Sequence, residues 1–200
     1  MIPIARSGLA LRHAPAWLQQ CGIDTVAFRS ALASTIPWQQ PWVTVYGRQH
    51  RTPRLTCWVA DPGCTYRYSG LQQAISPWTP QLSVLRELLH QQIGVRFNSL
   101  LLNRYRNGAD RMGWHADNEP ELDDAAPIAS ISLGATRDLR FRCRSGSDPS
   151  FALPLADGDL LLMDPPSQRH WQHALPQRAR LLTERINLTF RVIKKPSALS

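Results

Sequence analysis

Short apolar and alternating segments fill the second half of the chain. After Gly94 they follow one another between turns rich in Gly, Asp and Pro, and they read FNSLLLNRY, IASISLG, DLRFRC, FALPLA, GDLLLMD, RHWQHAL and ERINLTFRVI. Segments of this length and pattern predict β-strands. Because no long helical pattern separates them, they favour an antiparallel sandwich or barrel of the jelly-roll type, in which two sheets enclose a pocket.

Helical spacing occurs in the first half instead. Apolar residues recur every three or four positions up to Ile93, with prolines before them and Gly94 where a C-terminal cap belongs, which predicts a helix over residues 77–93. Asp24 is placed to cap a shorter helix that runs to about Ala33. Between the two helices, WVTVYG and LTCWVA bracket an arginine-rich turn and predict a two-stranded elaboration ahead of the core.

Length and composition indicate one domain with a real core. The 200 residues are 43% hydrophobic, which leaves little chain for a second full-sized domain. There is no run of about 18 apolar residues, and the N-terminus is broken by arginines, prolines and a histidine, so we expect neither a membrane span nor a signal peptide. The protein is expected to be soluble and intracellular. Four cysteines without a C-x-x-C pair favour reduced thiols.

The charge is strongly positive and almost entirely arginine. The formal net charge is +8, and 21 of the 23 cationic residues are arginine. Arginine matches phosphate bidentately and stacks on bases, so this balance favours a nucleic-acid partner. A codon bias of the source genome explains the same composition equally well, so charge alone does not establish that partner.

One cluster of residue types has the spacing of a metal site. His115 and Asp117 stand two apart, so in a strand both side chains point to one face. The third ligand is His170 or His173, and His173 is preferred because it shares a face with Trp171, whose ring would shield the site. Two histidines and one carboxylate leave three positions of an octahedral Fe(II) open. Taken singly, H-x-D is more often an ordinary hydrogen-bonded pair.

A second alternating pattern supplies cations near the C-terminus. Arg185, Asn187, Thr189 and Arg191 repeat every second residue between apolar neighbours. The two arginines lie about 20 Å apart along a flat strand, so one is assigned to the distal carboxylate of an anionic cosubstrate and the other to a role beside the metal. Asn103 and Tyr105 are placed to add hydrogen bonds from a neighbouring strand. The alternative is a solvated polar face of a sheet.

Together these motifs resemble a known family. The sequence N-R-Y at 103–105, H-A-D at 115–117, the histidine of HWQHALP and the closing R-I-N-L-T-F-R look like the AlkB-type Fe(II)/2-oxoglutarate-dependent nucleic-acid dealkylases, over roughly residues 40–193. VTVYGRQHRTPR, TYRYSGL and PIASISLGATRDLRFR are most similar to the subgroup that repairs alkylated duplex DNA. The resemblance implies a double-stranded β-helix with an N-terminal extension (1–37), a nucleotide-recognition lid (38–76) and a catalytic core (95–193).

The resemblance also implies a site and a reaction. His115, Asp117 and His173 would hold iron, and five residues would surround 2-oxoglutarate: Asn103, Tyr105, Arg185, Asn187 and Arg191. With dioxygen, family members oxidise the N-methyl group of bases such as 1-methyladenine and 3-methylcytosine, and they release formaldehyde, succinate and CO2.

Substrate contacts follow from the same resemblance. A base in a duplex must be extruded to reach such a metal. Tyr46 would fill the gap, Tyr66 and Tyr68 would contact the extruded base, and Glu119 would face its positive charge. Phosphate contacts are assigned to Arg48, Arg51 and Arg54, among which Arg54 is preferred. For each tyrosine, packing across a hairpin is an equally good reading, and for the arginines a solvated turn is nearly as good.

Two other functions remain open from the sequence. One keeps the iron chemistry but acts on RNA, a protein side chain or a lipid; the other is a jelly-roll binding module without catalysis. The basic charge and the arginine-rich hairpin favour alkylated DNA as the partner of a monomer without membrane attachment, located in the cytoplasm near the nucleoid if the source is bacterial.

Overall fold

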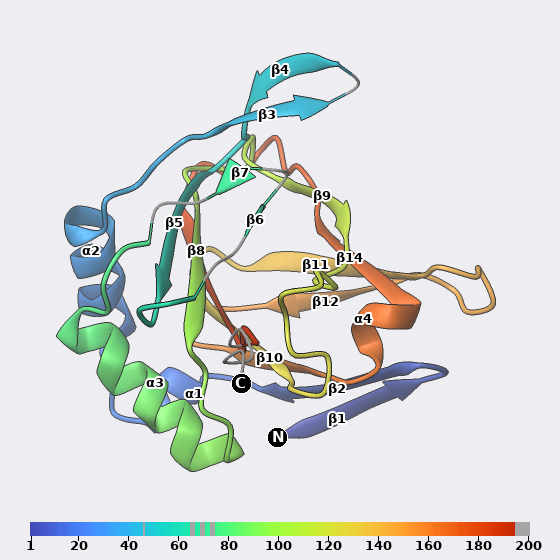
Figure 1. Cartoon of the computed structure of the whole chain (residues 1–200), viewed down its shortest axis with the longest axis horizontal. Helices are drawn as coiled ribbons and strands as arrows, with labels where there is room; N and C mark the ends of the chain where they lie inside the picture. Colours follow the sequence, from blue (N-terminus) through green and yellow to red (C-terminus); the bar gives the residue numbers. More distant parts are fainter. Residues whose placement is uncertain (46, 65–66, 69–70, 73–74, 195–200) are drawn as a thin grey trace, which may run out of the picture.

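Two antiparallel sheets face each other in the computed structural model, which describes residues 1–45, 47–64, 67–68, 71–72 and 75–194 (Figure 1). The large sheet has the order β1 (Ile2–Arg6), β2 (Leu9–Ala14), β13 (Leu160–Asp164), β10 (Ile128–Gly134), β15 (Arg185–Arg191), β8 (Ser99–Tyr105), β5 (Leu55–Ala60). The small sheet has the order β12 (Phe151–Leu155), β11 (Arg137–Cys143), β14 (Trp171–Leu175), β9 (Met112–His115). The predicted jelly roll is confirmed.

Two further hairpins and four helices complete the described chain. The hairpins pair β3 (Trp42–Val45) with β4 (Arg48–Arg51), and β6 (Arg67–Tyr68) with β7 (Leu71–Gln72). The helices are α1 (Trp17–Gln20), α2 (Thr25–Thr35), α3 (Pro80–Ile93) and α4 (Ser167–His170). None of these described helices is long and apolar enough to cross a membrane. All four cysteines are free thiols, as expected.

The predicted caps Asp24 and Gly94 bound the two longer helices, whereas α3 starts at Pro80, three residues later than predicted, and α2 runs two residues beyond Ala33. The Asp24 side chain accepts hydrogen bonds from the backbone N–H groups of Val26 and Ala27, both at 3.0 Å, and so caps α2. Helix α3 ends at Gly94, whose φ of 78° is left-handed and suits glycine. Figure 1 shows both helices on the side of the large sheet that faces away from the small sheet.

Alternation along the central strands separates two environments. One set of alternate residues on β8 and β15 packs into the main core with α2 and α3: Leu100, Leu102, Ile186, Leu188 and Phe190. The intervening residues of the same strands therefore face the small sheet. A second apolar cluster, which includes Phe141 and Trp171, closes the far end of the space between the sheets. Polar residues are left to line the remaining space, which is where the candidate site lies.

Three expectations about the first 76 residues need correction. Residues 2–14 are not a separate extension, because β2 pairs with β13 and adds two strands to the large sheet. The run LTCWVA does not form the predicted hairpin either: β5 pairs with β8, because its residues are buried on both faces. WVTV pairs with β4 instead, so Arg48 and Arg51 lie in a strand and not in a turn.

A glycine at the end of β10 gives a test of this packing. Gly134 has a φ of 84°, and a Cβ there would lie 2.6 Å from the Glu184 backbone oxygen. We expect Gly134→Ala to lower the free energy of unfolding by roughly 2 kcal/mol in urea denaturation. Gly113→Ala is the control, since a Cβ at that position meets nothing within 4 Å. Equal stability of the two variants would contradict the close approach.

Candidate metal centre and cosubstrate pocket

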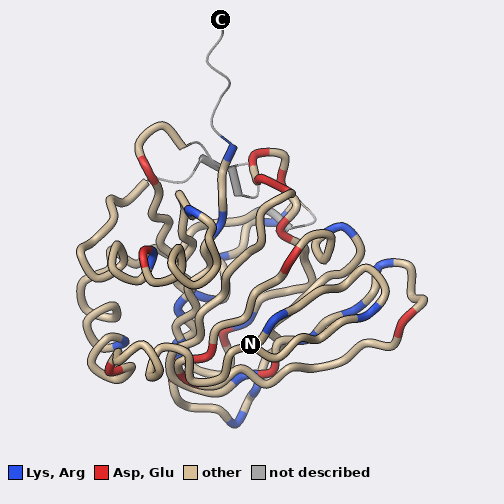
Figure 2. The backbone as a smooth tube through the Cα atoms, turned by 90° about the horizontal axis from the view of Figure 1, so that it is seen from below, with Lys and Arg blue, Asp and Glu red and all other residues tan. Residues whose placement is uncertain are grey.

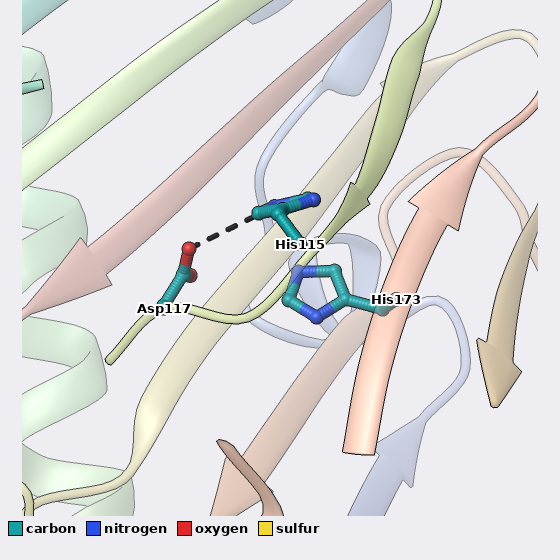
Figure 3. A group of neighbouring side chains, drawn as sticks. All are labelled: His115, Asp117 and His173. Atoms are coloured by element: carbon teal, nitrogen blue, oxygen red, sulfur yellow. Dashed lines mark ion pairs between the residues drawn. The ribbon is translucent and has the colours of Figure 1, made fainter. Parts of the chain in front are cut away.

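Two neighbouring strands of the small sheet bring the predicted metal ligands together. His115 at the end of β9 is the direct cross-strand partner of His173 on β14, and Asp117 follows two residues later (Figure 3). One ligand atom from each residue lies within 4.8 Å of the others. The imidazole centroids are 4.2 Å apart, and Nε2 of His115 is 3.7 Å from Oδ1 of Asp117. His170, the alternative ligand, lies exposed in α4, outside this group.

The tautomer of His115 is set by a carbonyl of its own strand. Its Nδ1 lies 2.9 Å from the carbonyl oxygen of Gly113. A carbonyl can only accept, so Nδ1 must carry the proton, and Nε2 keeps its lone pair for a metal.

Asp117 is held in its charged form. Its Oδ2 accepts two hydrogen bonds from Arg191, at 2.6 and 3.1 Å, and its backbone N–H donates to Gln168 at 3.0 Å. Burial alone would raise the pKa of Asp117, but the charge of Arg191, followed by the neighbouring histidines and the Arg191 hydrogen bond, holds it well below its usual range. With Oδ2 engaged by Arg191, Oδ1 is the oxygen nearest His115.

His173 is the neutral partner in this cluster. Burial, followed by the positive charge of His115, lowers the pKa of His173 to about 3. At neutral pH its imidazole is therefore unprotonated, which is the form that ligates a metal. Two imidazoles and one carboxylate suit a divalent iron ion with open positions.

A narrow cavity of about 40 Å³ extends from these ligands between the sheets. Its polar lining contains the predicted cosubstrate residues from β8 and β15: Asn103, Tyr105, Arg185, Asn187 and Arg191. Residues of the two strands lie side by side on one face of the sheet because β8 and β15 pair directly, with Asn103 beside Asn187 and Tyr105 beside Arg185. The amide of Asn187 donates to Ser130 and to the Ile131 carbonyl, which ties it to β10.

Arg185 is a buried cation at the far end of this lining. It is 2% exposed, and it donates to the Leu155 carbonyl at 2.9 Å and to the Ser132 hydroxyl at 2.6 Å. Within the described part of the chain no carboxylate forms an ion pair with it, and its Nε has no hydrogen-bond partner. Burial lowers the pKa of Arg185 to about 10, so it stays charged at neutral pH. A buried charge of this kind is compensated when an anion binds.

These observations fit the two groups that the site would hold. The donor set fits Fe(II), and the unpaired edge of Arg185 fits the distal carboxylate of a dicarboxylate such as 2-oxoglutarate. Arg191 differs from Arg185, since its guanidinium already binds the ligand Asp117. The two arginines thus have separate tasks, one beside the metal and one at the cosubstrate's distal end.

The structure describes only some of the predicted substrate-binding residues. Tyr46 and Tyr66 lie outside the described residues, and of Tyr68 only the backbone in β6 is described. Arg54 is not on the surface, where a phosphate contact belongs; it is 3% exposed and donates to Asn103. Glu119 lines a second cavity of about 250 Å³, which shares Asp117 and Arg191 with the first.

Sequence reasoning missed two residues that support the ligands. Gln168 holds the backbone of Asp117 across 51 positions, and Gly113 orients His115. For Gln168 the sequence carries no signal, because it stands just before RHWQHAL, which predicts a strand, and the short helix α4 over residues 167–170 is not predicted. For Gly113 the sequence gives only a general indication, since a metal-ligating histidine commonly donates its other ring N–H to a backbone carbonyl.

A jelly roll with two histidines and a carboxylate beside a buried anion-binding arginine defines the class of mononuclear non-haem iron oxygenases. The chain belongs to the 2OG-Fe(II) oxygenase superfamily, whose family model matches residues 10–191. The AlkB-type resemblance is confirmed by named relatives. The chain is 44% identical over 158 residues to the human "DNA oxidative demethylase ALKBH2", covering 76% of this chain and 60% of that protein.

Two other named relatives are 36% identical to this chain. The Arabidopsis thaliana protein named "DNA oxidative demethylase ALKBH2" is 36% identical over 192 residues, which cover 83% of this chain and 61% of that protein. The human "Alpha-ketoglutarate-dependent dioxygenase alkB homolog 3" is 36% identical over 171 residues, covering 81% and 59%. The chain thus spans about three fifths of the length of these curated relatives.

Solved structures support the fold. The structure titled "The structure of OsALKBH1" superposes with a TM-score of 0.59 at 21% identity, covering 94% of this chain and 99% of that one. A 2OG-Fe(II) oxygenase family oxidoreductase from Burkholderia pseudomallei gives the same TM-score at 18% identity, covering 93% and 85%. At such identities the likeness concerns the architecture alone.

Proposed function

We propose that this protein is an Fe(II)- and 2-oxoglutarate-dependent dioxygenase that removes alkyl groups from N-alkylated bases in DNA, of the 1-methyladenine and 3-methylcytosine type. The products are formaldehyde, succinate and CO2. The observation that carries the proposal is the His115, Asp117 and His173 cluster at one end of a cavity whose lining also contains a buried arginine, Arg185, without a carboxylate partner among the described residues. The names of the ALKBH2 relatives support the reaction and the DNA substrate.

Each residue has a defined task in this proposal. His115, Asp117 and His173 hold the iron, which together with 2-oxoglutarate and dioxygen supplies the oxidising power when bound. Arg185 binds the distal carboxylate of 2-oxoglutarate, and Tyr105 and the two asparagines of the pocket, Asn103 and Asn187, complete its lining. Arg191 keeps Asp117 charged and in place. The buried setting excludes bulk water from the reacting groups.

The proposal of a nucleic-acid substrate rests on the positive net charge of the chain and on the β3–β4 hairpin of the lid. The net charge is +8, and Figure 2 shows Lys and Arg residues at many separate places along the backbone. The exposed β4 strand carries Arg48 and Arg51, and the Arg51 guanidinium lies 4.8 Å from the ring centroid of the exposed Trp42. A cation stacked on an aromatic ring suits contact with a nucleic-acid backbone and bases.

The other assignments are part of the same proposal. Tyr46 fills the gap that the extruded base leaves in the duplex, Tyr66 and Tyr68 contact that base, and Glu119 faces its positive charge. The protein acts as a monomer inside the cell, in the cytoplasm near the nucleoid if the source is bacterial.

Methylated oligonucleotides test the function. We expect the protein with Fe(II), 2-oxoglutarate and air to lower the 1-methyladenine or 3-methylcytosine content of single- or double-stranded DNA and to release equal amounts of formaldehyde. Omission of 2-oxoglutarate is the control and should stop both changes. Unchanged methyl content in every DNA sample would contradict the DNA assignment, and loss of methyl groups from RNA alone would favour the RNA alternative.

A further inference from the structure

Arg54 occupies an unusual place for an arginine of a surface hairpin. It lies between β4 and β5, at the stem of the β3–β4 hairpin, yet it is only 3% exposed. Its Nε donates a hydrogen bond to Oδ1 of Asn103, at 2.7 Å. Asn103 lines the cavity that also contains Arg185 and the metal ligands. The arginine therefore reaches from the lid to the wall of the cosubstrate pocket.

This hydrogen bond determines which way the Asn103 amide points. A guanidinium can only donate, so the atom of the amide that faces Arg54 must be the carbonyl oxygen. The amino group then faces away from Arg54, and no described residue accepts a hydrogen bond from it. A donor at this point of the cavity wall suits a carboxylate. With the amide turned the other way, an oxygen would face the ligand and repel it.

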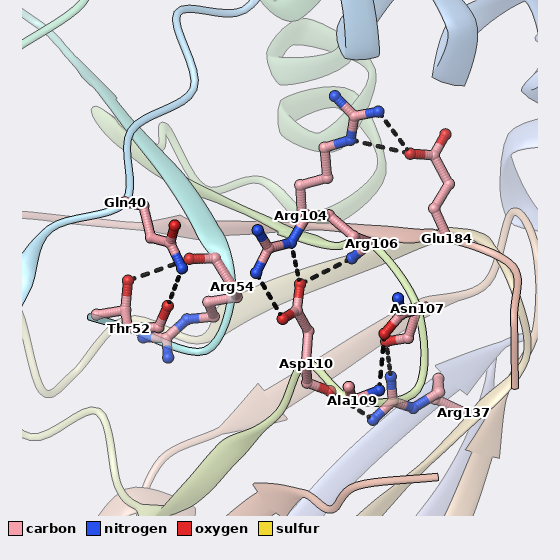
Figure 4. A network of polar contacts seen from close by, with 10 residues as sticks. All are labelled: Gln40, Thr52, Arg54, Arg104, Arg106, Asn107, Ala109, Asp110, Arg137 and Glu184. Atoms are coloured by element: carbon pink, nitrogen blue, oxygen red, sulfur yellow. Dashed lines mark hydrogen bonds and ion pairs between the residues drawn. The ribbon is translucent and has the colours of Figure 1, made fainter. Parts of the chain in front are cut away.

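The position of Arg54 depends in turn on the hairpin stem. The Thr52 hydroxyl donates to the Arg54 carbonyl at 3.1 Å, and the Gln40 amide donates to the Thr52 carbonyl at 2.9 Å (Figure 4). The Thr52 backbone N–H also donates to the Pro41 carbonyl at 3.0 Å. These bonds connect the stem residues on both sides of the hairpin to the arginine, so the hairpin and the pocket share one hydrogen-bonded path.

We propose that Arg54 is a positioning residue for the cosubstrate: it holds the Asn103 amide so that the amino group donates to a carboxylate of 2-oxoglutarate. The hairpin stem, through Arg54, thereby contributes to cosubstrate affinity. This inference rests on the proposed function in that it takes 2-oxoglutarate as the ligand of the cavity. It does not depend on which substrate is oxidised.

A double-mutant cycle on cosubstrate binding tests the proposal. The affinity of the Mn(II)-loaded full chain for 2-oxoglutarate is measured by calorimetry without oxygen, for the unchanged protein, Arg54→Met, Asn103→Ala and the double variant. We expect Arg54→Met to weaken binding about tenfold, in line with the loss of one well-placed hydrogen bond to a charged ligand. In the Asn103→Ala background the same change should have no further effect, because Arg54 acts through Asn103.

The controls separate positioning from general damage. Arg51→Met removes a cation from the exposed part of the same hairpin and should leave 2-oxoglutarate affinity unchanged. Arg54→Lys retains a donor and should bind more tightly than Arg54→Met. If Arg54→Met does not fold, the cycle is run with Arg54→Lys, whose smaller loss should likewise vanish in the Asn103→Ala background.

The outcomes also distinguish this inference from the proposed function. Unchanged affinity in Arg54→Met, or losses that add in the double variant, would overturn the role of Arg54 even if methylated DNA is repaired. A non-additive cycle in a protein that leaves every methylated base intact would support Arg54 and contradict the dealkylation. An unchanged protein that does not bind 2-oxoglutarate would overturn both.

Discussion

Replacing Asp117 by alanine is expected to reduce succinate formation to the level seen without added iron. The change removes the one anionic ligand of the cluster and leaves two imidazoles, which hold Fe(II) poorly. It also removes the carboxylate that accepts two hydrogen bonds from the buried Arg191. Because Arg191 loses this buried carboxylate partner, we expect the free energy of unfolding to fall by about 3–5 kcal/mol. Iron-dependent succinate assays and urea denaturation measure the two effects.

Asp124→Ala is the matched control for this prediction. Asp124 is an exposed carboxylate seven positions further on, where it pairs with the exposed Arg169. Its loss should leave both succinate formation and the urea denaturation midpoint unchanged, as expected for a solvent-exposed surface pair. Iron-dependent turnover retained in Asp117→Ala would contradict the assignment of Asp117 as a ligand.

Much of the site was predictable because strands repeat with a period of two. On β15 the polar residues from Arg185 to Arg191 alternate with Ile186 and Leu188, which pack into the main core. From the sequence alone, that alternation assigns every second side chain to the pocket. The same period predicts that His115 and Asp117 point to one face, whereas the pairing of His115 with His173 depends on the order of the strands in the small sheet.

The remaining features depend on contacts that a local pattern does not contain. Strand β1 is exposed at the edge of the large sheet, so it shows no apolar alternation from which to predict it. Arg48, Arg51 and Arg54 look equivalent in sequence. Arg54 alone is buried, because β5 begins one residue later and pairs with β8, where Asn103 lies opposite Thr56. Only the sheet order separates a surface cation from one that reaches the pocket.

Replacing Arg185 by methionine is expected to separate cosubstrate binding from stability. The variant loses the guanidinium assigned to the distal carboxylate of 2-oxoglutarate, so we expect affinity to fall by a hundredfold or about 3 kcal/mol, the value of a charge-assisted hydrogen-bonded contact. The visible charge-transfer band of the anaerobic Fe(II) and 2-oxoglutarate complex, titrated with 2-oxoglutarate, measures the change. Arg185→Lys keeps the charge without the planar fork and should bind with intermediate affinity.

Arg185→Met should change the free energy of unfolding less than Asp117→Ala does. Burial lowers the pKa of Arg185 to about 10, and a depressed pKa in a base means that the charged form is destabilised by folding at neutral pH, by roughly 3 kcal/mol. Methionine removes that cost but also the hydrogen bonds to Leu155 and Ser132, worth about 1 kcal/mol each. The two effects nearly cancel, so the ligand-free variant should unfold within about 1–2 kcal/mol of the unchanged protein. A loss as large as that of Asp117→Ala would show that Arg185 serves the fold, and unaltered 2-oxoglutarate affinity would show that the anion binds elsewhere.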